Sequence, residues 1–179
     1  RQVSSAASDV YKRQELIDYQ EYPVAAAERA TKARRSLGVG FIGLAHYLAK
    51  LGYKYDSQEA WDAVHGLSES FQYYLLKSSN QIAKEKGWCE NFGRTKYSDG
   101  ILPIDTYKTD VDEITSQELA HDWEGLRASI NEFGLRHSTL SAQMPSESSS
   151  VVSNATNGIE PPRGYLSIKK SKKGPLKQI

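Results

Sequence analysis

Cysteine and long hydrophobic runs are scarce in this sequence. Cys89 is the only cysteine among 179 residues, which excludes a disulfide framework, a CxxC redox centre and a cysteine-rich zinc site within the chain. No stretch approaches the ~20 consecutive apolar residues of a membrane helix, and no charged-then-apolar signal segment opens the chain. We therefore expect a cytoplasmic protein without a membrane partner.

An excess of charge of either sign is also lacking. The chain has 23 Lys and Arg residues against 22 Asp and Glu, a net charge of +1, and 39% hydrophobic residues. This balance is typical of ordinary globular proteins and gives no support to bulk attraction to nucleic acid. We therefore predict no nucleic-acid partner, and any other partner must be recognised locally.

The two ends have features of a partial sequence. The chain opens on Arg1 rather than Met, and it closes directly after the turn-like Lys172–Pro175, where a returning strand is expected to continue. Residues 1–14 show no clear period and resemble translated adapter sequence. We expect them to form a non-native or disordered leader, and we expect the folded domain over residues 15–179.

Helical spacing of apolar residues predicts several helices. An Ala-rich run after Pro23 favours one helix, and LAHYLAKLG predicts another that stops at Gly52. The longest helix is expected from an Asp56-x-x-Glu59 capping box to Gly87. Its expected apolar face comprises Trp61, Val64, Leu67, Phe71, Tyr74, Leu75 and Ile82. A further helix is expected between Asp122 and Gly134, with Trp123, Leu126 and Ile130 buried.

Short β-compatible segments alternate with these helices. SLGVGF from Ser36, STLSAQM from Ser138 and GYLSIKK from Gly164 are each predicted to be strands. Helices that alternate with short strands indicate an α/β architecture.

A glycine-rich motif, Gly38-Val39-Gly40-Phe41-Ile42-Gly43, matches the GxGxxG pattern of dinucleotide-binding loops. That fingerprint needs a buried parallel strand before its first glycine, and residues 31–36 are too polar for one. Asp56, the candidate ribose-binding acid, is better explained as a helix cap. Glycines that serve a strand-to-helix bend and close packing are the alternative.

A serine-rich segment, Pro145-Ser146-Glu147-Ser148-Ser149-Ser150, lies between a predicted strand and a predicted helix start. Unpaired amides at a helix N-terminus and short hydroxyl side chains suit a phosphate group. The Glu147 carboxylate would repel that group, so we expect it either to point aside while its backbone N–H serves the ligand or to accept a hydrogen bond from another part of the substrate. A capped helix with surplus serines is the structural alternative, and the motif alone leaves both open.

The histidines and the basic tail carry weaker signals. His46, His65, His121 and His137 show no ligand spacing with carboxylates or cysteine, so we predict no metal site. From Arg163 onward there are six basic residues and no acids, which indicates a free basic hairpin.

Longer stretches carry a family resemblance. RRSLGVGFIGLAHYLAKLG, FQYYLLKSSNQIAKEKG, GILPIDTYK, DWEGLRASI and GLRHSTLSAQMPSESSSVVSNATNGIEPPRGYLSIK are similar to the large (alpha) subunit of class I ribonucleoside-diphosphate reductase. Gly43 departs from the family, whose members carry Asn at this position. The resemblance implies a fragment of a ten-stranded α/β barrel, helix-rich with a few short strands. It also implies that Ser146, Glu147, Ser148 and Ser149 bind the substrate diphosphate.

The family's chemistry reduces ribonucleoside diphosphates to 2′-deoxyribonucleoside diphosphates by radical steps that need three cysteines. Cys89 lies in the polar GWCEN segment, unlike the family's catalytic cysteines, so we expect a bystander thiol, no catalytic residue in this chain and no activity of the chain alone. The resemblance also implies nucleotide effectors and several partners. These are a small (beta) subunit with a radical and metal centre, a second large subunit, and thioredoxin or glutaredoxin. We expect no cofactor in this chain.

The competing hypothesis is a self-contained α/β nucleotide- or phosphate-binding module that uses either the glycines of residues 38–43 or the serine-rich segment. Such a module should close its own sheet and bury Val39, Phe41, Leu140 and Ile168. A barrel fragment should leave such residues on an open edge.

Overall fold

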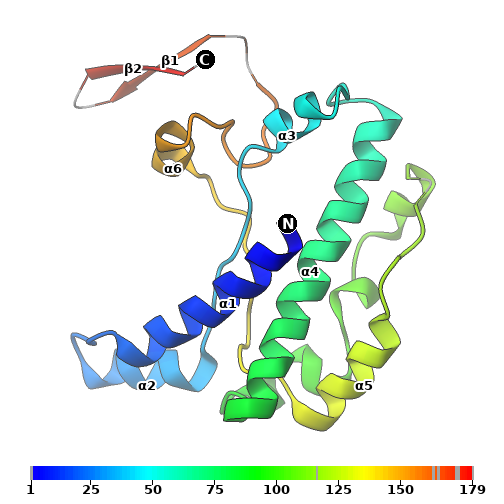
Figure 1. Cartoon of the computed structure of the whole chain (residues 1–179). Helices are drawn as coiled ribbons and strands as arrows, with labels where there is room; N and C mark the ends of the chain where they lie inside the picture. Colours follow the sequence, from blue (N-terminus) through cyan, green and yellow to red (C-terminus); the bar gives the residue numbers. More distant parts are fainter. Residues whose placement is uncertain (1, 116, 163, 165, 172–173, 179) are drawn as a thin grey trace. The chain divides into compact units, whose positions relative to one another are not determined.

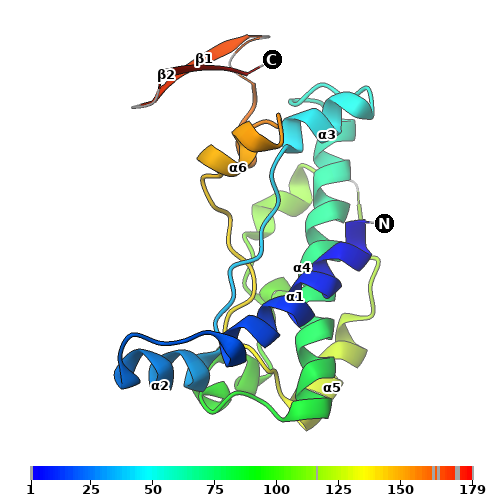
Figure 2. The ribbon, with the colours of Figure 1, turned by 60° about the vertical axis from the view of Figure 1, so that its left-hand side comes forward.

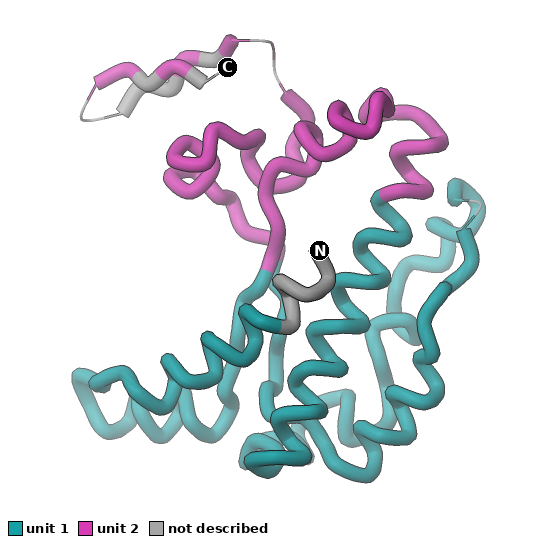
Figure 3. Tube along the Cα trace, viewed as in Figure 1, with its two compact units in different colours: residues 1–39, 64–142 teal, residues 40–63, 143–179 magenta. Residues whose placement is uncertain are grey.

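The computed structural model describes residues 2–115, 117–162, 164, 166–171 and 174–178. The chain divides into two compact units, residues 1–39 with 64–142 and residues 40–63 with 143–179 (Figure 3). Within the described residues, no helix is both long and apolar enough to cross a membrane. The main elements (Figure 1) are α1 (Gln2–Tyr19), α2 (Ala25–Arg34), α3 (Leu44–Lys50), α4 (Gln58–Lys86), α5 (Trp123–Phe133), α6 (Glu147–Val152), β1 (Ser167–Ser171) and β2 (Gly174–Gln178).

Helix α1 differs from the expectation for the first fourteen residues. The segment is helical from Gln2, and Val10 is fully buried in the core of the first unit. Val10 and Ile17 are seven residues apart and both buried, so they share one face of the helix. The structure therefore has a helix where a disordered leader was one of the expectations. The non-native origin of these residues stays a prediction.

Helix α4 begins slightly later than predicted. Its first residue is Gln58, and the Ala60 N–H donates to the hydroxyl of Ser57 at 3.4 Å. Ser57 rather than Asp56 therefore serves as the cap, and the predicted start was wrong by one residue. The end is as predicted, because the helix stops at Lys86 and Gly87 has φ +80°, a conformation that glycine adopts without strain.

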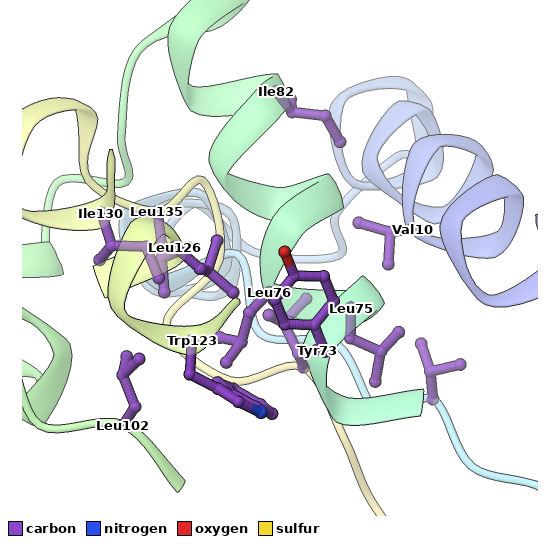
Figure 4. Packing of buried hydrophobic residues seen from close by; sticks show 12 residues of the cluster. Val10, Tyr73, Leu75, Leu76, Ile82, Leu102, Trp123, Leu126, Ile130 and Leu135 are labelled. Atoms are coloured by element: carbon purple, nitrogen blue, oxygen red, sulfur yellow. The ribbon is translucent and has the colours of Figure 1, made fainter. Parts of the chain in front are cut away.

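The core of the first unit gathers on the second half of α4. Figure 4 shows the side chains of Leu75 and Leu76 among residues contributed by α1 and α5. The first half of the predicted apolar face is less buried, and Trp61 is 41% exposed. The cluster comprises Val10, Val39, Tyr73, Leu75, Leu76, Ile82, Leu102, Trp123, Leu126, Ile130, Leu135 and Leu140.

Helix α5 has the bounds, cap and buried face that the sequence predicts. The Asp122 carboxylate accepts a hydrogen bond from the Gly125 N–H at 2.8 Å, and Gly134 follows the last turn. The buried residues are Trp123, Leu126 and Ile130. Between α4 and α5 the described chain has four short 3₁₀ turns, η1 (Phe92–Arg94), η2 (Lys96–Asp99), η3 (Pro103–Asp105) and η4 (Thr109–Glu113).

A buried carboxylate ties α4 to the start of α5. Glu69 of α4 is 8% exposed, and it accepts hydrogen bonds from the backbone N–H groups of Ala120 and His121 at 2.9 and 3.0 Å. It also accepts one from the indole N–H of Trp123 at 3.0 Å. Burial by itself would raise the pKa of this carboxyl, but these hydrogen bonds stabilise the ionised form and hold its pKa below the usual value.

Two of the three predicted strands form only one bridge. Val39 and Ser141 pair in parallel, and these extended stretches run side by side in Figures 1 and 2. The Leu37 N–H donates to Thr139 O and the Val39 N–H donates to Leu140 O. Between these two hydrogen bonds the first segment advances by two residues and the second segment by only one. This irregular register interrupts the β-ladder, so no regular strands form.

The third predicted strand is confirmed from Ser167 onward as β1, which pairs antiparallel with β2, Ile168 facing Lys177. This hairpin is the only sheet within the described residues. The helix-rich description with few strands is thus confirmed. The burial of the four residues that should distinguish a self-contained module from a barrel fragment matches neither expectation. Val39 and Leu140 are buried, Phe41 is half-buried and Ile168 is 58% exposed.

Candidate functional site

The serine-rich segment forms the start of α6. The first helical hydrogen bond runs from the Ser150 N–H to Ser146 O at 2.8 Å, so the N–H groups of residues 147–149 have no acceptor within the helix. Ser146 precedes the helix, but its side chain makes no capping hydrogen bond. The N–H groups of Ser148 and Ser149 are therefore left for another acceptor.

The four serines of this segment fall into two groups. Ser148 and Ser149 are exposed, and neither hydroxyl is hydrogen-bonded to another residue that the structure describes. Ser150 is buried, and its hydroxyl donates to Glu147 O at 3.1 Å. Ser146 is 5% exposed. The structure thus presents two of the four hydroxyls outward.

The Ser146 side chain is held by residues eleven and twelve positions further along the chain. Its hydroxyl donates to Asn157 Oδ1 at 2.9 Å, and its backbone N–H donates to the same oxygen at 2.9 Å. The Gly158 N–H donates to the Ser146 hydroxyl, also at 2.9 Å. The hydroxyl is therefore engaged as both donor and acceptor within the chain.

The loop around Asn157 is attached to the start of α3. Thr156 O accepts a hydrogen bond from the Gly43 N–H at 3.0 Å, and Gly158 O accepts one from the Leu44 N–H at 3.2 Å. Gly43 has φ +75°, and a Cβ built there would lie 3.3 Å from Ala155 Cβ. The last glycine of the GxGxxG motif thus serves a sharp backbone turn against this loop.

The dinucleotide interpretation of that motif loses its structural context. The fingerprint requires a strand before the first glycine, but the residues up to Arg34 belong to helix α2. A Cβ on Gly38 would lie 3.2 Å from Ala142 Cβ, so this glycine allows a close approach of two chain segments. Both glycines have packing roles, as the alternative hypothesis expected.

The lone cysteine is inaccessible in the structure. Cys89 is 1% exposed, and its burial raises the pKa of the thiol, which lowers the thiolate fraction on which reactivity depends. Among the described residues, no three His, Cys, Asp or Glu side chains are grouped as metal ligands would be.

Sequence reasoning missed Asn157 and Gly158 as part of this site. The Asn-Gly pair reads as an ordinary turn, and nothing in its spacing points back to Ser146. It also missed Glu69, because a single acidic residue on a helix gives no signal of its backbone partners.

Comparisons with known proteins agree with the family resemblance. The family model described as "Ribonucleotide reductase, barrel domain" matches residues 9–179. The chain is 61% identical over 164 residues to the ribonucleoside-diphosphate reductase subunit alpha of Haemophilus influenzae, covering 92% of this chain and 22% of that protein. It is 58% identical over 163 residues to subunit alpha of reductase 1 of Escherichia coli, covering 91% and 21%.

A viral protein is also similar. The ribonucleoside-diphosphate reductase subunit alpha of phage T4 is 50% identical over 164 residues, covering 92% of this chain and 21% of that subunit. The chain thus spans about a fifth of the length of these relatives. Because the family model covers nearly all of the sequence, the chain belongs to the barrel-domain family of ribonucleotide reductases.

Proposed function

We propose that this chain is part of the large subunit of a ribonucleoside-diphosphate reductase and contributes the site for the substrate diphosphate. The names of the relatives indicate for them a reduction of ribonucleoside diphosphates, and the subunit proposed here would reduce these to 2′-deoxyribonucleoside diphosphates. The observation that carries the proposal is the two unpaired N–H groups of Ser148 and Ser149 in the first turn of α6, beside the outward hydroxyls of the same two residues.

Each group of this segment has a definite part in the proposal. The N–H groups and the hydroxyls of Ser148 and Ser149 donate hydrogen bonds to phosphate oxygens, which accept them strongly because they are charged. Glu147 takes part through its backbone N–H, while its exposed carboxylate stays clear of the phosphates. Ser146 contributes no donor to the diphosphate, because its hydroxyl and its N–H are both engaged with the Asn157 loop. Its role is to hold the segment in place.

The radical steps belong to residues outside this chain. They need one thiyl cysteine and a reducing pair, and Cys89 is a single buried thiol. We therefore assign no catalytic residue here. The proposal extends to the partners that this chemistry requires: a small subunit with the radical and metal centre, a second large subunit, nucleotide effectors, and thioredoxin or glutaredoxin as the reductant. A cytoplasmic location is part of the same proposal.

A chimera tests the diphosphate site. Residues 15–179 replace the matching segment of the full-length H. influenzae subunit, which is 61% identical, and cytidine diphosphate reduction is measured with the small subunit and thioredoxin. Ser148→Ala and Ser149→Ala should each raise KM or lower kcat/KM by roughly ten- to a hundredfold, because each removes a donor to a charged acceptor worth ~1.5–3 kcal/mol. Ser148→Glu should do more harm, since it places negative charge beside the phosphates.

Ser153→Ala is the matched control, because this exposed serine follows the other end of α6 and should leave KM unchanged. Unchanged kinetics in Ser148→Ala and Ser149→Ala would refute the diphosphate site. The 179-residue chain alone, mixed with the small subunit, should form no deoxynucleotide.

A further inference from the structure

We propose that Asn157 is a positioning residue for the diphosphate site, acting through Ser146. This inference rests on the proposed function. Asn157 need not touch the substrate: its carboxamide fixes the residue before α6, and α6 presents the donors of residues 147–149. The observation that carries the proposal is one side-chain oxygen, Asn157 Oδ1, that accepts hydrogen bonds from both the N–H and the hydroxyl of Ser146 at 2.9 Å.

These contacts form a closed hydrogen-bonded set. Asn157 Oδ1 accepts twice from Ser146, and the Ser146 hydroxyl accepts in turn from the Gly158 N–H at 2.9 Å. Ser146 and Gly158 are both buried, so water does not easily replace a bond that is lost. Two groups of Ser146 would be left without an acceptor if the carboxamide were removed.

The backbone that carries this carboxamide is held on both sides of Asn157. The residues that flank it, Thr156 and Gly158, have their carbonyl groups bound to the N–H groups of Gly43 and Leu44. One residue further on, Ile159 O accepts from the Tyr55 hydroxyl. Asn157 therefore projects from a backbone fixed on either side.

Close packing restricts the same loop. Gly158 has φ +54°, and a Cβ there would lie 3.2 Å from Met144 O and 3.3 Å from the Gln143 amide nitrogen. Gln143 also donates to Phe41 O at 3.2 Å. The chain entering the serine-rich segment and the loop that holds it are thus in contact, which leaves Ser146 little freedom while Asn157 is present.

Helix α6 needs this support because it is short. It has six residues, Glu147–Val152, and a helix of that length does not persist in water without tertiary contacts. The direction of its first three N–H groups depends on where Ser146 is held. Loss of the hydrogen bonds from Ser146 to Asn157 should therefore let these N–H groups lose their common orientation. Residues that bind the nucleoside should not be affected.

The test uses the same chimera with Asn157→Ala. KM for cytidine diphosphate should rise roughly tenfold and kcat at saturating substrate should stay within about twofold, because the site is loosened rather than removed. Inhibition by inorganic pyrophosphate should weaken by a similar factor. Inhibition by cytidine, which has no phosphate, should not change. Asn154→Gly is the control: Asn154 is exposed, has φ +47° and tolerates glycine.

A milder variant covers the case in which Asn157→Ala does not fold. Ser146→Ala removes the hydroxyl but keeps the backbone N–H bond to Asn157, so KM should rise about threefold with the same selectivity for phosphate. In the double variant Asn157→Ala/Ser146→Ala, the rise in KM should be smaller than the product of the two single rises, because both substitutions act on one set of hydrogen bonds.

The outcomes separate this inference from the proposed function. If Ser148→Ala and Ser149→Ala raise KM but Asn157→Ala and Ser146→Ala do not, the positioning role is overturned and the diphosphate site stands. If Asn157→Ala weakens cytidine and pyrophosphate inhibition equally, its role is a general structural one and the inference is again overturned. If none of the four variants changes KM, the diphosphate site itself fails.

Discussion

Acidification should destabilise the first unit through one buried histidine. His137 is fully buried, and its Nδ1 lies 2.9 Å from the Ser79 hydroxyl, which also accepts the His137 N–H at 3.1 Å. Which of the two atoms donates depends on the ring tautomer, whereas the other ring nitrogen, Nε2, is buried without a partner among the described residues. A doubly protonated ring would therefore carry an N–H group at Nε2 without an acceptor there. Burial, with the nearby charges of Arg136 and Arg35, lowers the pKa of His137 to about 3.

The sign and size of the effect follow from this pKa. The unfolded chain takes up the proton near pH 6.5, the ordinary value for histidine, whereas the folded chain does so only near 3. The contribution of His137 to the free energy of unfolding is therefore fully present above pH 6.5 and is lost as the pH falls toward 3. Between pH 7 and pH 5 the loss from this group should be about 2 kcal/mol.

Urea unfolding at pH 7 and pH 5, followed by tryptophan fluorescence and circular dichroism, measures this loss. His137→Asn is the informative variant, because asparagine offers an acceptor to Ser79 and does not titrate. It should be less stable than the parent at pH 7, since the ring leaves a gap, but should lose about 2 kcal/mol less on going to pH 5. Carboxylates contribute equally to both proteins and cancel in the comparison. The same loss in both proteins would refute the assignment of a buried neutral histidine.

Two further predictions concern the buried carboxylate and the glycine motif. Glu69→Gln should destabilise the chain by ~1–3 kcal/mol, because the second oxygen that accepts the Ala120 N–H becomes an NH₂ group facing that donor, and the uncharged oxygen left for Trp123 is a weaker acceptor. The lowered pKa of Glu69 also predicts that this variant loses less stability than the parent below the usual carboxyl range, and urea unfolding across pH 3–7 checks both effects. Gly43→Ala should lower Tm, because Gly43 has φ +75° and an added Cβ would lie close to Ala155. Titration of the parent chain with NAD should leave its tryptophan fluorescence and its Tm unchanged. Saturable binding of NAD would restore the dinucleotide-binding interpretation.

Local signals in the sequence predicted the elements whose stability is local. Helix α5 is the clearest case: its cap at Asp122, its stop at Gly134 and its three buried residues all lie within one short window. The start of α4 was missed by one residue because Asp56 and Ser57 can both cap a helix, and their sequence does not rank them. The helical state of α1 was missed because Val10 is buried only through contacts with other elements of the first unit.

Contacts between distant segments could not be predicted in the same way. The stretches around Val39 and Ser141 were each recognised as β-compatible, but the register between segments about a hundred residues apart has no local signature. The irregular bonds of Leu37 and Val39 follow from that pairing and reduce two predicted strands to a single bridge. The family resemblance, in contrast, depends on whole stretches of sequence and needs no knowledge of the pairing.

The serine-rich segment shows how much a correct local structure decides about chemistry. Once α6 begins at Glu147, Ser146 and Ser150 are four residues apart and share one face, so both are buried when that face packs. Ser148 and Ser149 then fall on the other side, next to the unpaired N–H groups. The sequence predicted a helix start with four similar hydroxyls, but only the direction of burial divides them into two that are buried, Ser146 and Ser150, and two that can meet a phosphate. The buried Ser146 is bound by Asn157, a contact that no local pattern in the serine segment reveals.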